Sequence, residues 1–178
     1  MFISLQQLDQ RPVRFHVDIP AGELEYDPKL EQTSVLHAEG TVTLLNHSLG
    51  EVRVEGKLTV GMKATCDRCL ETIDYPLENR FDLLYMPAES GKGGEDEIDE
   101  GAIEVGYYED NGLVLNDILR EVVLLALPMQ LVCDEACKGI CPVCGRNRNQ
   151  GDCGCHVETA DDRWSKLRAL RAEVGPHN

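Results

Sequence analysis

Apolar and polar residues alternate along most of the first half of the chain. The alternation is clearest from Val52 to Cys66, where nearly all even positions are apolar and the odd positions are mostly charged or polar. A period of two sustained over this length predicts one long strand of an antiparallel sheet, with one buried and one solvated face. After Cys69 the alternation resumes on the odd positions, from Ile73 to Tyr85. The two runs predict a long β-hairpin with Cys66 and Cys69 at its tip.

Shorter runs predict further strands in the same half. Val13 to Ile19 alternates in the same way, and Leu36 to Leu44 places its apolar residues on one face. Ile103 to Tyr107 suggests one more strand, and Asn111–Gly112 after it is a turn signal. Proline cannot donate to a ladder, so Pro76 indicates that the return strand of the hairpin lies partly at an edge.

The second half predicts two helices. Asn116 can cap a helix from about Asp117 to Leu127, which Pro128 would end. Its inward residues would be Ile118, Leu119, Val122, Val123 and Ala126. A last helix is expected after Thr159, with Trp164 in its apolar stripe.

Eight cysteines fall into four short pairs along the chain. The pairs are Cys66 with Cys69, Cys133 with Cys137, Cys141 with Cys144, and Cys153 with Cys155. Zinc takes four soft donors at the corners of a tetrahedron, and a tight turn between two cysteines aims both sulfurs at one point. Pro142 and Gly145 suit such a turn, because proline restrains it and glycine tolerates positive φ. The spacing therefore predicts about two Zn²⁺ ions per chain, with all eight cysteines as ligands.

The sequence favours other uses of these cysteines less strongly than zinc binding. The N-terminus lacks the features of a signal peptide and the longest apolar run, Val122–Leu127, is too short to span a membrane. We therefore expect a reducing, cytoplasmic location, where close cysteine pairs bind metal more often than they cross-link. Structural disulfides, redox-active thiols and an iron–sulfur cluster remain as alternatives, and His156 can replace a cysteine ligand. Four pairs can be matched in three ways, and spacing alone does not decide among them.

The net charge restricts the classes of molecule that the chain is expected to bind. The chain has 17 basic and 32 acidic residues, a formal net charge of −15. Such a chain repels phosphate backbones unless its basic residues cluster on one face. A solvated acidic segment spans residues 88–101, whereas residues 138–171 contain seven basic and four acidic residues. The candidate RNA- or partner-binding residues in this last quarter are Arg163, Lys166, Arg168 and Arg171. Lys138, Arg146 and Arg148 belong to the same basic set.

No sequence motif indicates catalysis. The five histidines show no zinc-hydrolase spacing, and the chain has no phosphate-binding or nucleophile-elbow motif. A hydrolytic zinc site also keeps one coordination position open for water, whereas sulfur here supplies a full set. We therefore expect a protein that is not an enzyme and has no small-molecule substrate.

Several motifs, in this order, resemble the YceD family of bacterial large ribosomal RNA subunit accumulation proteins. They are the long strand ending in Cys66–Leu70, the acidic segment, the helix ending in Leu124–Pro128, and the run Cys133–Gly145. The resemblance extends from about residue 10 to residue 172. It implies a cytoplasmic, non-enzymatic role in the accumulation of 23S ribosomal RNA and in large-subunit assembly. The implied partner is that RNA or a pre-ribosomal particle, contacted directly or through a basic ribosomal protein, with no membrane involved.

The family also bears on the pairing of the cysteines. Some members keep the hairpin pair and a ligand after the Leu-x-Leu-Pro stretch but lack the later cluster. We therefore prefer Cys66, Cys69, Cys133 and Cys137 as one site and the remaining four cysteines as the other. A zinc-stabilised adaptor that binds a basic protein outside the ribosome is the alternative function that composition permits.

Together these features predict an α+β fold. We expect a mainly antiparallel sheet with a long hairpin, one or two helices and a C-terminal cysteine-rich zinc-binding segment. Residues 1–130 would form the β-rich domain with one helix. Residues 131–178 would form the cysteine-rich zinc-binding tail and the C-terminal helix.

Overall fold

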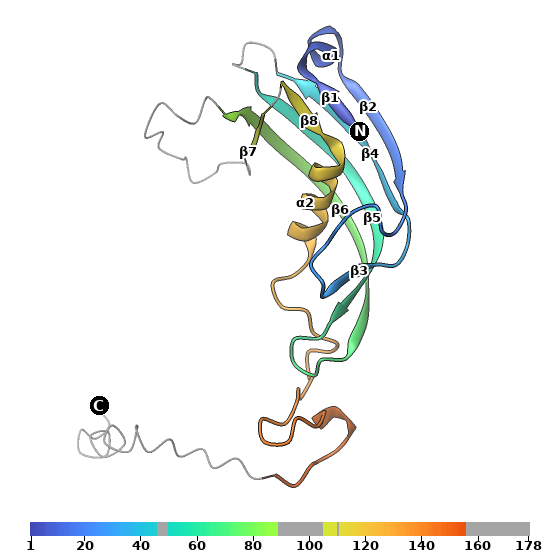
Figure 1. Ribbon diagram of the computed structural model, residues 1–178, viewed down its shortest axis with the longest axis vertical. Helices are drawn as coiled ribbons and strands as arrows, with labels where there is room; N and C mark the ends of the chain where they lie inside the picture. Colours follow the sequence, from blue (N-terminus) through green and yellow to red (C-terminus); the bar gives the residue numbers. More distant parts are fainter. Residues whose placement is uncertain (46–49, 89–104, 110, 156–178) are drawn as a thin grey trace, which may run out of the picture. The chain divides into compact units, whose positions relative to one another are not determined.

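The computed structural model describes residues 1–45, 50–88, 105–109 and 111–155. The chain divides into two compact units, Met1–Cys66 with Glu71–Cys133 and Asp67–Leu70 with Asp134–Asn178. Its mainly antiparallel sheet, its helices and its C-terminal cysteine cluster confirm the predicted α+β class (Figure 1). The domain boundary at residues 130 and 131 stays a prediction. The helix expected after Thr159 lies outside the described residues.

The first unit is built on a six-stranded sheet. Its strands follow the order β2 (Val13–Ile19), β4 (Leu36–Leu44), β5 (Val52–Thr65), β6 (Thr72–Pro87) and β7 (Val105–Tyr108), and β3 (Leu30–Gln32) pairs with β5. The β5–β6 hairpin is in register from Val52–Tyr85 to Thr65–Thr72, as predicted. β7 is parallel to β6 and pairs only with Leu84–Pro87. At Pro76, β6 is therefore an edge of the described sheet.

Three short elements complete the unit. β1 (Phe2–Ser4) and α1 (Leu5–Gln10) lie at the N-terminus, and β1 is antiparallel to β8 (Gly112–Val114), which precedes the second helix. Ser4 and Gln7 form a capping box, in which each side chain accepts a hydrogen bond from the other residue's backbone N–H. The hydrophobic pattern did not predict these elements, because three-residue strands are too short to establish a period.

The helix after β8 differs at its start from the sequence expectation. α2 (Leu115–Ala126) has Val114 at its N-cap and no side-chain capping bond. Asn116 does not cap the helix; its Oδ1 accepts a hydrogen bond from the amino group of Met1 at 3.1 Å. The end of the helix agrees with the prediction, since Pro128 follows the C-cap residue Leu127.

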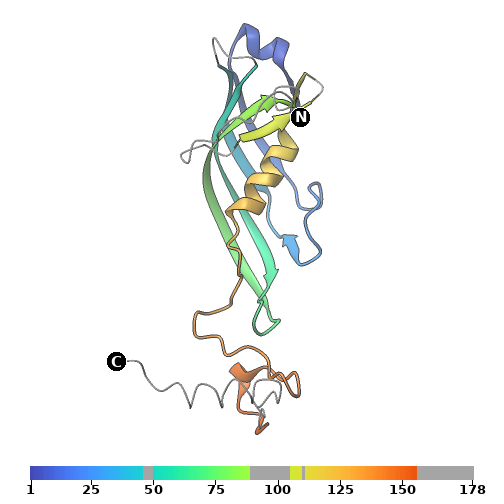
Figure 2. The ribbon, with the colours of Figure 1, turned by 90° about the vertical axis from the view of Figure 1, so that its left-hand side faces the viewer.

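The core lies between α2 and one face of the sheet, which the two views show from different sides (Figures 1 and 2). Four of the five helix residues expected to face inward are buried: Ile118, Leu119, Val122 and Val123. Ala126 is partly buried and packs against the same core. The even positions of β5 supply the opposing surface, with Val52, Val54 and Met62 fully buried.

Two glycines face each other in the middle of this sheet. Gly40 of β4 is in register with Gly56 of β5, and the next partners outward are Phe15 and Phe81. A Cβ on Gly40 would lie 2.7 Å from the ring of Phe15, and one on Gly56 would lie 2.8 Å from the ring of Phe81. The phenyl rings therefore occupy the space that side chains at both glycines would need.

Candidate metal centre

The structure gathers all eight cysteines into two groups of four. One group is Cys66, Cys69, Cys133 and Cys137, and the other is Cys141, Cys144, Cys153 and Cys155. Within each group the four sulfur atoms lie within 4.8 Å of one another. Four sulfurs bound at about 2.3 Å to one tetrahedral ion would lie about 3.8 Å apart, so both groups can hold a metal ion. This grouping is the one that the sequence analysis preferred.

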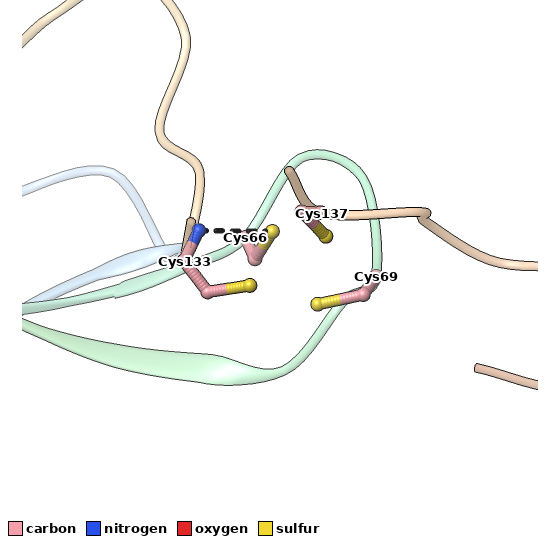
Figure 3. A group of neighbouring side chains, drawn as sticks. All are labelled: Cys66, Cys69, Cys133 and Cys137. Atoms are coloured by element: carbon pink, nitrogen blue, oxygen red, sulfur yellow. Dashed lines mark hydrogen bonds between the residues drawn. The ribbon is translucent and has the colours of Figure 1, made fainter. Parts of the chain in front are cut away.

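The hairpin tip supplies half of the first group (Figure 3). The backbone N–H of Cys66 donates to the carbonyl of Glu71 at 2.8 Å, which closes the turn. Leu70 adopts a positive φ of 63° at its end, a conformation uncommon for a residue with a side chain. Cys66 is fully buried, and its sulfur accepts a hydrogen bond from the backbone N–H of Cys133 at 3.4 Å. Such a donor favours the thiolate form that a metal requires.

A compact turn after α2 supplies the other half of the first group. The backbone N–H of Cys137 donates to the carbonyl of Asp134 at 3.0 Å. The carboxylate of Asp134 also accepts a hydrogen bond from the N–H of Ala136 at 2.7 Å. Asn149 donates from Nδ2 to the sulfur of Cys137 at 3.2 Å. Cysteine spacing does not predict this role of Asn149, since its contact with Cys137 depends on the fold of the segment between them.

Arg68 is a second positioning residue that the sequence analysis missed. Its Nη1 donates to the carbonyls of Glu135 at 2.9 Å and Cys137 at 3.3 Å. Its own carbonyl accepts a hydrogen bond from the N–H of Ile140 at 2.8 Å. A Cβ on Gly139 would lie 2.9 Å from the Arg68 carbonyl oxygen, so only glycine allows this approach. Arg68 thus holds the backbone that carries Cys137.

The second group is local in sequence. Gly145 has a φ of 72°, as expected, and its N–H donates to the carbonyl of Cys141 at 2.8 Å. The N–H of Cys141 donates in turn to the carbonyl of Arg146 at 2.8 Å. Between the last two cysteines, Gly154 has a φ of 66°, and its N–H donates to Asp152 Oδ1 at 3.1 Å. These turns bring two cysteine pairs to one place without any regular strand or α-helix.

The thiols of the second group titrate unevenly. Hydrogen bonds from the backbone N–H groups of Cys144 and Val143 lower the pKa of Cys141 to about 6. Hydrogen bonds with the side chains of Cys144 and Cys153 raise the pKa of Cys155 to about 12. The first thiolate therefore forms readily, whereas the last proton is retained while the neighbouring sulfurs carry the charge. A cation at the centre removes this conflict, because it compensates the charge of all four thiolates.

Other candidate residues fall outside the described part of the chain. These residues are His156, Arg163, Lys166, Arg168 and Arg171, and the centre of the acidic segment lies outside it as well. Within the described residues, the two cysteine groups are the only clusters of histidine, cysteine or acidic side chains close enough to hold a metal ion. None of the helices described here is sufficiently long and apolar to cross a membrane.

The fold and the cysteine groups define a small β-sheet protein with two closed four-sulfur sites that can bind metal. Residues 54–171 match the family described as "Large ribosomal RNA subunit accumulation protein YceD". Since the match covers more than half of the chain, the chain belongs to the YceD family. The resemblance inferred from the motifs is confirmed.

One of the similar curated proteins carries the name of the same family. The chain is 25% identical over 146 residues to "Large ribosomal RNA subunit accumulation protein YCED homolog 1, chloroplastic" of Arabidopsis thaliana, covering 70% of this chain and 46% of that protein. It is 30% identical over 127 residues to uncharacterized proteins of Mycobacterium bovis and Mycobacterium tuberculosis, covering 71% of this chain and 58% of theirs. The chain thus spans about half the length of these curated relatives. No solved structure matches it.

Proposed function

We propose that this chain is a non-enzymatic, cytoplasmic factor that supports accumulation of 23S ribosomal RNA and thereby large-subunit assembly. The observation that carries the proposal is membership of a family described by ribosomal RNA accumulation. Two closed sets of four sulfurs also favour a structural use of metal, because they leave no open position for water or substrate. The expected partner is large-subunit ribosomal RNA or a pre-ribosomal particle, contacted directly or through a basic ribosomal protein. No small-molecule substrate and no membrane are required.

We further propose that both cysteine groups hold zinc, about two ions per chain. Four thiolates at tetrahedral spacing are the donor set of structural zinc sites. The ions would supply only cross-links and charge compensation. Elemental analysis of protein purified without oxidation should find about two zinc ions per chain, whereas one ion or none would contradict the proposal. Iron in place of zinc would instead support the iron–sulfur alternative.

The function is tested by removing the protein from cells and measuring ribosomal RNA. The ratio of 23S to 16S RNA should fall, and the tagged protein should sediment with precursors of the large subunit on a sucrose gradient. A matched strain that expresses the protein again should recover the normal ratio. An unchanged ratio together with protein confined to the top fractions would contradict the proposal.

A second function is favoured by the net charge of −15. A zinc-stabilised adaptor could bind a basic protein outside the ribosome through charge complementarity. Capture of native complexes at low salt separates the two functions, because an assembly factor should bring down large-subunit RNA and the adaptor should not. Replacing Arg163, Arg168 and Arg171 with glutamate tests whether the last quarter of the chain contributes to either contact.

A further inference from the structure

The face of the sheet turned away from the core carries an open groove of about 610 Å³. It crosses β2, β4, β5 and β6, and the backbones of Gly40 and Gly56 form part of its wall. The charged side chains that line it are Arg14, His16, Glu39, Lys57 and Arg80. Three basic residues, one imidazole and a single carboxylate make this a basic site on a strongly acidic chain. It does not belong to the metal sites described above.

Strand pairing brings these residues together. His16 is in register with Glu39, Glu39 with Lys57, and Lys57 with Arg80. Arg14 lies two positions from His16 on the same strand and therefore on the same face. From β2 to β6 there are three gaps between strands of about 4.8 Å each, so the row spans about 14 Å. The residues are separated in sequence by up to 66 positions from Arg14 to Arg80, and their clustering exists only in the sheet.

The carboxylate of this groove already has partners. Glu39 accepts a hydrogen bond from Lys57, with Oε1 and Nζ 2.9 Å apart, and its other oxygen lies 3.4 Å from Nδ1 of His16. The contact with Lys57 lowers the pKa of Glu39, so its charge is retained and remains opposite that of Lys57. Other acids on the face are held by neighbours, Asp82 by Arg53 and Asp18 by His37. Glu55 lies 3.9 Å from Nε of Arg53, whereas Glu78 has no ion pair with another described residue.

Arg14 and Arg80 differ from the other charged residues of the groove, because they have no charged partner among the described residues. Neither has an ion pair or a side-chain hydrogen bond with another described residue, and both are exposed. Within the groove lining, three basic side chains against one carboxylate leave a local charge of +2 with His16 neutral, although Glu55 and Glu78 lie on the same face. Planar guanidinium groups bind phosphate through paired hydrogen bonds, which an ammonium group cannot reproduce.

We propose that this groove binds the backbone of a single-stranded RNA segment, with Arg14 and Arg80 contacting phosphates and His16 stacking on a base. The inference rests on the proposed function and names the surface that would contact the RNA. A chain of charge −15 can hold RNA only through a local basic site, because the rest of its surface repels phosphate. Single-stranded RNA fits better than a duplex, since exposed bases can stack on an imidazole or a guanidinium plane. An acidic protein segment would satisfy the cations but would offer no base to stack on the exposed ring of His16.

The test compares two double variants with equal changes in charge. Arg14→Glu with Arg80→Glu alters the groove, and Lys29→Glu with Arg120→Glu alters exposed residues that do not line it. The probe is a labelled 12-nucleotide single-stranded RNA of mixed sequence, with binding followed by fluorescence anisotropy from about 50 to 200 mM salt. We expect the groove variant to bind at least tenfold more weakly than the control. The slope of log affinity against log salt should fall by about 1.4, which corresponds to two lost phosphate contacts.

Each result of this experiment either supports or overturns RNA binding by the groove. Equal affinities of the two variants, or no binding by the wild type, would overturn the inference, even if the protein still sediments with precursors of the large subunit. Tighter binding of a poly-glutamate peptide than of RNA would overturn it in favour of an acidic protein partner. Thermal unfolding of both variants checks that the fold is intact. A groove variant that binds RNA poorly in vitro while 23S RNA is normal in cells without the protein would support the groove and contradict the proposed function.

Discussion

The sheet unit and the cysteine segment are stabilised by different means. In the sheet unit, buried apolar residues from β1 to α2 form one continuous cluster. From residue 134 to residue 155, by contrast, only Cys137, Gly139 and Cys141 are buried, and Ile140 and Val143 are exposed. A segment this small cannot exclude enough apolar surface from water to fold on that basis. Its order must therefore depend on the cysteine groups.

Removal of metal should have the largest effect. A chelator added to the native protein should abolish slow hydrogen exchange in residues 134–155, because a metal held by the cysteine groups would supply the folding energy of that segment. Away from the hairpin tip the sheet should keep its protection at moderate temperature, since its buried apolar cluster contains no cysteine. Hydrogen exchange with mass spectrometry measures both regions at once, and excess zinc added with the chelator is the control. Unchanged protection of residues 134–155 after metal loss would show that this segment does not depend on metal for its order.

Single cysteine substitutions should then distinguish the two sites. Cys66→Ser should lower the melting temperature of the sheet unit, because Cys66 is fully buried and its sulfur accepts a bond from a residue 67 positions away. Cys153→Ser should disorder only the tail, since its group closes a short local loop. Thermal unfolding followed by circular dichroism provides the measurement. Equal losses from the two substitutions would count against the assigned grouping.

A core substitution should affect the sheet unit alone. Leu119→Ala removes a fully buried side chain of α2 and should lower the free energy of unfolding by about 2–5 kcal/mol. Leu124→Ala on the same helix is the matched control, because Leu124 is exposed and its truncation should cost far less. Chemical denaturation measures the difference, and metal content should stay constant in both variants. Loss of metal from Leu119→Ala at temperatures where it is folded would mean that the two regions are coupled more strongly than expected.

The smallest effect is expected on the polar face of the sheet. The hydrogen bonds from Arg53 lower the pKa of Asp82, so this pair stabilises the fold at pH values above the pKa of an unfolded aspartate. The contribution should be lost as pH falls below about 4, through the lowered pKa of the folded state. Asp82→Asn should therefore lower the melting temperature slightly at pH 7 and not at pH 2, because both side chains are exposed and screened by solvent. A larger drop in melting temperature at pH 2 than at pH 7 would contradict this pH dependence.

The sequence predicted well what is periodic and poorly what depends on contacts between distant residues. The β5–β6 hairpin, the buried face of α2 and the four cysteine pairs each follow from local spacing, and the structure contains them. The position of Asn116 did not predict its role, because a tertiary contact with Met1 competes with capping. β3 and β8 are too short to produce a pattern.

Prediction from sequence was limited in the same way at the metal sites and at the basic groove. Cysteine spacing identified the eight sulfurs, but not the residues that orient them, because the bonds of Arg68 and Asn149 depend on how the chain returns. The charge count along the chain favoured the last quarter as the basic region. It could not reveal Arg14, Lys57 and Arg80, which become neighbours only when four strands pair. A search for basic clusters in sequence therefore misses any site assembled across a sheet.

The paired glycines of β4 and β5 restrict the order in which this sequence can change. A side chain at Gly40 or Gly56 would collide with a phenyl ring and with the backbone of the neighbouring strand. Loss of the ring of Phe15 or Phe81 would relieve only the first of these collisions. Replacement of either glycine is therefore expected to require that the strands separate as well, a change that no single substitution supplies. In evolutionary terms the four positions should be inherited as one block.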